Sequence, residues 1–200
     1  AGHAVVGIVT QGRLPIKILS GEMAWHRGGP RVVFEPFEFF SPRLIKDHIQ
    51  TLLAGTVAET RVFGEEYRSS GCTQDLMTAT QILSDGLTRS GFGRHLSFSD
   101  RMMIPTATEI FSDQDAMDTE QYLSEAKAEA EKILDQQYTL FENVVQKLLQ
   151  SERVTSHDLE DLVKQFMVGS SDQVQAVSER KQPITLERYQ VGIESLRLVS

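Results

Sequence analysis

Apolar residues recur at helical spacing along two long stretches of this chain, and this periodicity constrains the fold more than any other feature. The first stretch begins at Ser41-Pro42, where a hydroxyl side chain can cap a helix and proline suits the first helical position. It predicts a helix that ends near Val62. The second stretch predicts one helix from Thr119 to about Gln150. The apolar positions are Leu44, Ile45, Ile49, Leu52 and Leu53 in the first, and Tyr122, Ala126, Ala130, Ile133, Leu134, Phe141, Val144, Leu148 and Leu149 in the second.

Shorter patterns at the beginning of the chain add one helix and a small sheet. Residues 1–10 are typical of the end of a helix, and Gly12 lies in the turn that follows. Two short apolar runs, at residues 16–19 and 31–34, are separated by glycines and Pro30, which predicts an antiparallel pair of strands. The fold class is therefore mainly α, with a small antiparallel β-sheet.

The rest of the chain divides into helices and connections. A helix is expected from Thr73 to Gly91, with its apolar stripe at Leu76, Ala79, Leu83 and Leu87. Residues 97–118 are interpreted as a loop. The run Thr155-Ser156-His157-Asp158 can cap a further helix. Residues 169–183 indicate a polar linker and 186–198 a last short helix, so we expect one domain at 1–168 and an extension at 169–200.

Small residues interrupt the helix predicted from Pro42. Ala54, Gly55 and Ala58 would let the backbone of another helix approach closely. Glycine in a helix interior costs about 1 kcal/mol relative to alanine. We therefore expect a packing reason for Gly55.

Composition excludes several classes of function. The 200 residues carry a formal net charge of −8, which argues against nucleic acid as a partner. No apolar run approaches the roughly 20 residues of a membrane span, and no secretion signal is visible, so we expect membrane contact only through segments outside this chain. The single cysteine, Cys72, excludes an internal disulfide and suits a reducing compartment.

The chain opens on Ala1-Gly2-His3, which is similar to the second half of the zinc-protease signature H-E-x-x-H. A helix with that signature places two imidazoles one turn apart and a carboxylate beside them. Only the second histidine, His3, is present. We expect the first histidine and the general-base glutamate just upstream of Ala1, so this chain contains no catalytic residue of its own.

Two further motifs carry a resemblance to a known family. The run from Leu52 to Glu65 reads LLAGTVAETRVFGE, and that from Ser70 to Thr80 reads SGCTQDLMTAT. They resemble the L-G-G-R-x-A-E-E-x-x-F-G and T-T-G-A-x-N-D-L-x-x-A-T motifs in the peptidase domain of FtsH-type AAA+ zinc proteases. The resemblance covers roughly residues 1–165.

This resemblance implies a zinc site with His3 and Asp75 as ligands and water in the open position. It also implies that Glu59 makes a hydrogen bond near the metal ligands, as partners outside the ligand set do when they orient an imidazole. Each residue has an ordinary structural alternative: His3 as a core histidine, Asp75 as a carboxylate at a helix start, and Glu59 as a surface residue. Cys72 is interpreted as a small packing residue rather than a ligand.

The strand Ile16, Lys17, Ile18 and Leu19 is expected to bind substrate. Metalloproteases often hold the substrate backbone as an added strand on the edge of a small sheet. The alternative is an ordinary half-buried edge strand. The resemblance places such a strand at the active site.

The resemblance further implies an assembly. The chain would be the proteolytic domain of an ATP-dependent zinc metalloendopeptidase that degrades unfolded or membrane-associated polypeptides in a homo-oligomeric ring, with a hexamer expected. The chain has no G-x-x-x-x-G-K-[ST] loop, so ATP would bind only in an AAA+ module outside it. The expected location is the cytoplasmic side of a membrane, or the cytoplasm if the protein is untethered.

Departures from the family motifs keep two other functions open. Thr56, Thr60 and Gln74 replace the arginine, the second glutamate and the asparagine of those motifs, and residues 25–30 differ from the usual short turn. A catalytically inactive pseudopeptidase that serves assembly is therefore one alternative. A helical interaction module with coincidental similarity is the other, and it predicts that His3 and Asp75 lie far apart.

Overall fold

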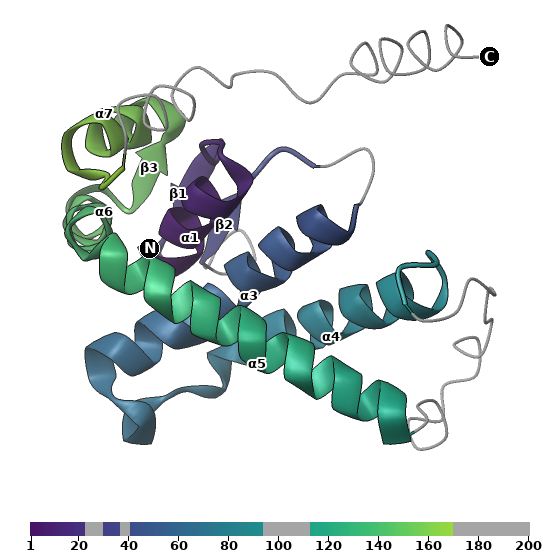
Figure 1. Ribbon diagram of the computed structural model, residues 1–200. Coiled ribbons are helices and arrows are strands. Elements are labelled where there is room, and N and C mark those ends of the chain that lie inside the picture. The colour runs from purple at the N-terminus through teal and green to yellow at the C-terminus, as the bar shows by residue number, and fades with distance from the viewer. Residues whose placement is uncertain (23–29, 37–40, 94–112, 170–200) are drawn as a thin grey trace, which may run out of the picture.

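Helices dominate the structure, as the apolar periodicity predicts. The computed structural model describes residues 1–22, 30–36, 41–93 and 113–169, and within these ranges it has six α-helices and one three-stranded antiparallel sheet (Figure 1). The predicted fold class is confirmed. The predicted last helix at 186–198 and most of the predicted linker lie outside the described residues.

Two helices at the centre of the fold pack backbone against backbone. α1 (Gly2–Gln11) ends at Gly12, whose φ of 62° is a conformation that favours glycine. α3 (Pro42–Phe63) begins as predicted, because the Ser41 hydroxyl oxygen accepts a hydrogen bond from the backbone N–H of Leu44 at 3.2 Å. A Cβ atom on Gly2 would collide with the carbonyl oxygen of Ala54. α1 is therefore the close neighbour that the small residues of α3 predicted.

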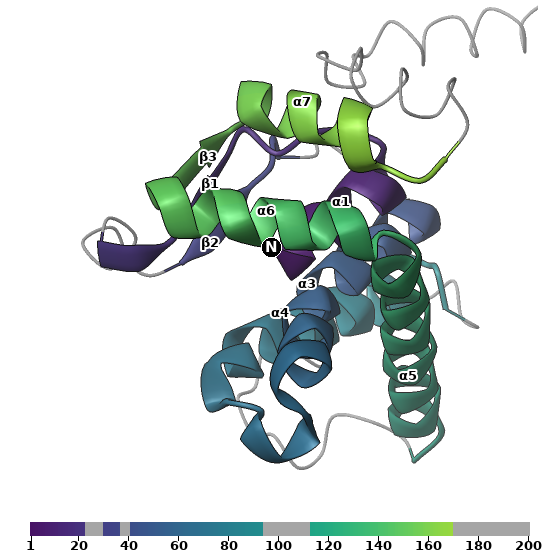
Figure 2. The same cartoon turned by 90° about the vertical axis from the view of Figure 1, so that its left-hand side faces the viewer.

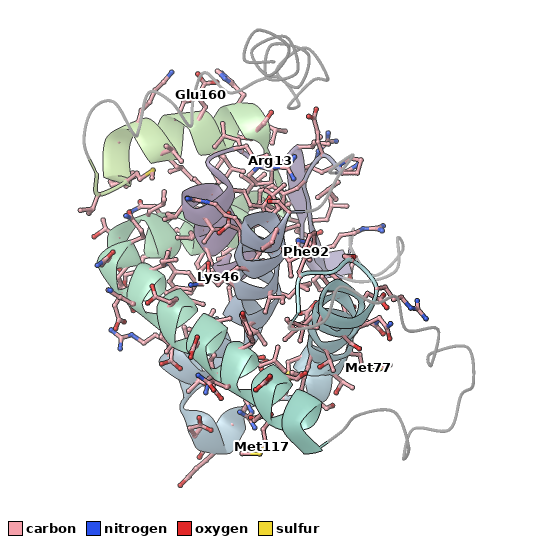
Figure 3. The ribbon with its side chains drawn as sticks, turned by 45° about the vertical axis from the view of Figure 1, so that its right-hand side comes forward. Arg13, Lys46, Met77, Phe92, Met117 and Glu160 are labelled. Carbon is pink, nitrogen blue, oxygen red and sulfur yellow. The ribbon has the colours of Figure 1, made fainter. Side chains whose placement is uncertain are left out.

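α4 (Thr73–Thr88) follows two single turns of 3₁₀ helix, η1 (Glu65–Tyr67) and η2 (Ser70–Cys72). Ala79 and Leu83 are buried in a cluster with residues of α3, as the stripe predicted. Leu76 was wrongly assigned to that stripe, since it is 47% exposed. Met77, also exposed, is labelled beside α4 in Figure 3.

The helix predicted from Thr119 to Gln150 is two helices, α5 (Asp113–Gln136) and α6 (Tyr138–Ser151). α5 begins inside the segment that was interpreted as a loop. The break is at Gln137, whose φ of −106° and ψ of 25° are not helical. The predictions for Tyr122 and Leu149 are wrong, since these side chains are 49% and 74% exposed. Leu123 and Leu140 are buried instead.

The sheet has one strand more than the sequence predicted. β1 (Lys17–Leu19) pairs antiparallel with β2 (Arg31–Val33), as expected, and also with β3 (Arg153–Thr155). The strand order is β2-β1-β3, and Ile18 lies opposite both Val32 and Val154. β3 was missed because a run of three residues between two helices is too short for its alternation of polar and apolar side chains to indicate a strand.

α7 (Ser156–Phe166) follows β3 directly and starts with the predicted cap. The Thr155 hydroxyl accepts a hydrogen bond from the backbone N–H of Asp158, and the Asp158 carboxylate accepts one from the backbone N–H of Thr155. Leu159 and Val163 are fully buried.

Two clusters of buried apolar residues form the interior. The first joins α1, the sheet, α6 and α7, and the second joins α3 to α4. α3 and α5 contribute to both, through Ala54, Val57, Ala130 and Leu134 to the first and Ile45, Ile49, Leu53, Leu123 and Ala126 to the second. In Figure 2, α6, α7 and the sheet form the upper part of the molecule, α4 lies in the lower part, and α5 runs down beside them. None of the helices in the described ranges is long and apolar enough to cross a bilayer.

Candidate metal centre

His3 and Asp75, the two predicted metal ligands, meet in the structure. The His3 Nε2 atom lies 3.0 Å from the Asp75 Oδ2 atom, across 72 positions of sequence. Each side chain is 31% exposed, so both are accessible from solvent. The alternative of a helical module with coincidental similarity predicted that these residues lie far apart, and the distance contradicts it.

The packing of α1 on α3 positions His3. Gly2 brings α1 into backbone contact with α3, and His3 is the next residue. The imidazole of His3 then lies against Gly55, where a Cβ atom would be 2.5 Å from the imidazole Cε1 atom. This contact is the packing reason that was expected for a glycine inside α3.

Asp75 is carried by α4, and the turn before α4 is hydrogen-bonded to α3. Asp75 lies in the first turn of α4, where exposed backbone N–H groups favour a carboxylate. The Ser69 hydroxyl caps η2 by accepting a hydrogen bond from the backbone N–H of Gly71. The Glu59 carboxylate accepts hydrogen bonds from the Ser69 hydroxyl at 2.7 Å and from its backbone N–H at 3.2 Å. Glu59 thus holds the segment that leads to Asp75.

The prediction for Glu59 needs a correction in its detail. Within the described residues, both of its hydrogen bonds go to Ser69, and neither His3 nor Asp75 is its partner. Glu59 therefore acts on the segment before Asp75, through Ser69, and makes no direct hydrogen bond to either predicted ligand. Cys72 lies at the start of α4, and its thiol donates a hydrogen bond of 3.6 Å to the Ser69 carbonyl oxygen.

The two predicted ligands suit zinc in chemistry and in spacing. Imidazole nitrogen and carboxylate oxygen are common zinc ligands, and two such atoms at ~2.0–2.1 Å from a tetrahedral ion lie about 3.3 Å apart. The observed 3.0 Å is close to that value. No group of three or more His, Cys, Asp or Glu side chains that could hold a metal occurs among the described residues. The two residues fit as part of a zinc site, and at least one more protein ligand would have to come from outside the described ranges.

Comparison with known proteins identifies the family. A sequence profile of peptidase family M41 matches residues 1–162. The chain belongs to peptidase family M41. The predicted resemblance to the FtsH-type peptidase domain is confirmed, and this M41 domain is a proteolytic domain by descent.

Three relatives are similar over most of the M41 domain. The ATP-dependent zinc metalloprotease FtsH 3 of Phytoplasma mali (strain AT) is 30% identical over 170 residues, 82% of this chain and 26% of that protein. FtsH 3 of Synechocystis sp. (strain ATCC 27184 / PCC 6803 / Kazusa), with the same description, is 26% identical over 189 residues, 82% of this chain and 29% of that protein. The chloroplastic ATP-dependent zinc metalloprotease FTSH 5 of Arabidopsis thaliana is 24% identical over 191 residues, 86% of this chain and 27% of that protein. The chain therefore spans less than a third of the length of these relatives.

The strand predicted to bind substrate does not lie at an edge of the sheet. β1 is the central strand, so β2 and β3 already occupy both of its sides. Ile18 and Leu19 are each 3% exposed, and the backbone N–H of Ile16 donates to the Val33 carbonyl oxygen. Ile16, Lys17, Ile18 and Leu19 therefore cannot receive an added strand, and that part of the prediction is wrong.

β2 is the edge strand beside the helix that carries His3. The ring of Phe34, directly after β2, packs on Gly7, one turn after His3 on α1. The guanidinium group of Arg13 lies 5.8 Å from the centre of the same ring. Sequence reasoning missed Phe34, although a second glycine inside a helix, Gly7, was a signal for a close neighbour.

Two other histidines, His48 and His157, lie in the described part of the chain, and neither joins this site. His48 lies on α3, where burial lowers its pKa and the nearby charge of Arg13 lowers it further. His157 lies in the first turn of α7. His26 and His95 lie outside the described residues.

Proposed function

We propose that this M41 domain is the proteolytic part of a zinc metalloendopeptidase, and that His3 and Asp75 are two of its zinc ligands. The observation that carries the proposal is the 3.0 Å separation of His3 Nε2 and Asp75 Oδ2. α1 and α4, the helices that carry the two motifs, bring these side chains together, and both side chains are accessible to solvent. A simple ion pair between His3 and Asp75 would not require the family motifs or the close packing of α1 on α3.

In such a site the bound zinc ion would lower the pKa of a bound water and polarise a peptide carbonyl. The residues of this chain would hold the zinc-binding atoms in place. His3 presents Nε2 from the face of α1 that packs on α3, and Asp75 presents Oδ2 from the first turn of α4. Glu59 and Ser69 keep the start of α4 in place. The proposal requires a further histidine and a general-base glutamate from sequence outside this chain.

The proposed substrate is an unfolded or membrane-associated polypeptide held in extended form. Strand addition gives little side-chain selectivity, because main-chain hydrogen bonds provide the affinity. Since β1 is central, we assign this role to the outer side of β2. The packing of Phe34 on Gly7 supports β2 over β3, because it brings the end of β2 next to the helix of His3. β3, in contrast, runs directly into α7.

The proposed complete protein adds an ATP-driven module. The relatives are named ATP-dependent zinc metalloproteases, and this chain spans only 26–29% of their length. We therefore propose an AAA+ module outside this chain, a homo-oligomeric ring, with a hexamer as the first expectation, and a location in the cytoplasm or at the cytoplasmic side of a membrane.

The ligand assignment is tested in the complete protein. Asp75→Asn keeps the size and removes the charge, so it should abolish casein hydrolysis and reduce bound zinc, measured by atomic emission, from one ion per chain. The matched control is Asp161→Asn, an exposed aspartate on α7. It should keep both properties. Full zinc occupancy and activity in Asp75→Asn would contradict the assignment.

A catalytically inactive scaffold is the second candidate. The replacements Thr56, Thr60 and Gln74 favour it, and the buried Thr60 hydroxyl oxygen has no hydrogen-bond partner among the described residues. The same zinc measurement separates the candidates. A wild-type complete protein that forms its assembly but binds no zinc would support the scaffold.

A further inference from the structure

Gly55 is the residue of α3 on which the imidazole of His3 rests. A Cβ atom at position 55 would lie 2.5 Å from the imidazole Cε1 atom, 2.8 Å from Nε2 and 3.4 Å from Nδ1. The first two distances are shorter than any that real side chains adopt. The Nε2 atom is also the one that lies 3.0 Å from Asp75 Oδ2. A side chain at position 55 would therefore displace the very atom that faces the second ligand.

We propose that Gly55 is a positioning residue for the metal centre: the missing side chain allows His3 to direct Nε2 towards Asp75. This inference rests on the proposed zinc function. It assigns a task to a position that touches neither metal nor substrate. Helix propensity alone would favour alanine at this interior position of α3, so the glycine works against local stability.

A comparison of Gly2 with Gly55 distinguishes the positioning of His3 from general helix packing. A Cβ atom on Gly2 would collide with the backbone oxygen of Ala54, which cannot move without shifting α3. At Gly55 the colliding atoms belong to a side chain that is 31% exposed and can rotate into solvent. Gly55→Ala should therefore be accommodated by movement of the imidazole. The fold survives, and the geometry of the metal centre is lost.

The test uses the complete protein and compares Gly55→Ala with Gly86→Ala. Gly86 is also a glycine inside a helix, but a Cβ atom there meets only the flexible end of Ile45 at 3.0 Å and Phe92 at 3.7 Å. Zinc affinity is measured by competition with a chromophoric chelator, and ligand geometry by the visible absorption of the Co²⁺-substituted protein. Gly55→Ala should weaken zinc binding by about ten- to a hundredfold, the effect of losing a ligand-orienting contact. It should also change the Co²⁺ spectrum, whereas Gly86→Ala should leave both unchanged.

A stability measurement keeps the inference testable if Gly55→Ala folds poorly. The double variant His3→Ala with Gly55→Ala removes the imidazole that the new methyl group would strike. In the metal-free protein, the two changes should couple, and the double variant should unfold at a higher temperature than Gly55→Ala alone. If Gly55→Ala folds poorly, independent effects of the two changes would overturn the inference. If it folds well, wild-type zinc affinity and a wild-type Co²⁺ spectrum would overturn it. Equal zinc binding by the wild type and His3→Ala would instead overturn the proposed function.

Discussion

Asp158 shows how one residue of this domain can make folding depend on pH. Its Oδ2 atom accepts hydrogen bonds from the Thr155 hydroxyl at 2.6 Å and from the Thr155 backbone N–H, and its Oδ1 atom pairs with the Lys147 ammonium group at 3.0 Å. The hydrogen bonds from Thr155 are the largest cause that lowers the pKa of Asp158 from 3.8 to about 2, and Lys147 adds to the shift. The folded state therefore prefers the ionised carboxylate.

A carboxyl group whose pKa is lower in the folded state stabilises the fold above the unfolded pKa, and this contribution is lost as pH falls from about 4 towards 2. Asp158→Asn keeps the shape of the cap without the charge. We expect it to flatten the fall of the free energy of unfolding over this range, measured by urea denaturation at several pH values. Asp161→Asn on the same helix is the control. Equal pH slopes in wild type and Asp158→Asn would refute this origin.

Single residues were predictable from the sequence where a motif names them and not where a partner is distant. His3 and Asp75 were both assigned from their motifs, and the structure brings them together. Gly55 was recognised as a residue that needed a packing reason, but its partner could not be read from the sequence. Ser69, which links Glu59 to the start of α4, lies in a loop without a pattern. Hydrogen bonds of that kind depend on tertiary structure.

At the scale of elements, the junction of α5 and α6 depends on one side chain. Gln137 is 5% exposed, and its amide pairs with the backbone of Val168: Nε2 donates to the carbonyl oxygen at 2.6 Å, and Oε1 accepts from the N–H at 2.8 Å. The pairing fastens the end of α7 to the break between the two helices. Glutamine is a good helix former, so the sequence contains no signal for a break there.

Gln137→Ala removes this pairing. Losing two hydrogen bonds, at about 0.5–1.5 kcal/mol each, should lower the free energy of unfolding by roughly 1–3 kcal/mol. Urea denaturation monitored by circular dichroism measures the change. Gln146→Ala, at an exposed position of α6, should stay within about 0.5 kcal/mol of the wild type. A wild-type midpoint in Gln137→Ala would mean that the junction is held by apolar packing alone.

Elements with a clear apolar period and a cap were predictable in type and position. α3 and α7 begin at their predicted caps, Ser41 and Thr155. β3 was invisible, because its pairing with β1 is decided by tertiary contacts over more than a hundred residues. The consequence was a wrong functional detail: without β3, β1 was expected to be an edge strand.

At the scale of the whole molecule, the proposed metal centre lies where the two buried clusters meet. α1, with His3, belongs to the first cluster, and α4, with Asp75, belongs to the second. α3 and α5 already join the clusters by apolar packing. A zinc ion held by His3 and Asp75 would add a third link, and this link would exist only in the folded state.

A ligand that binds only the folded state stabilises it by RT ln(1 + [L]/Kd), about 2.7 kcal/mol when its free concentration is one hundred times Kd. Zinc should therefore raise the unfolding temperature of the complete protein, measured by scanning calorimetry with and without a chelator. Because the ion would join both clusters, the whole M41 domain should shift as one transition. Asp75→Asn should abolish the zinc-dependent shift and leave the metal-free transition near its wild-type temperature. If zinc moved only part of the domain's transition, the ion would not bridge the two clusters, and the meeting of His3 with Asp75 would be a local ion pair.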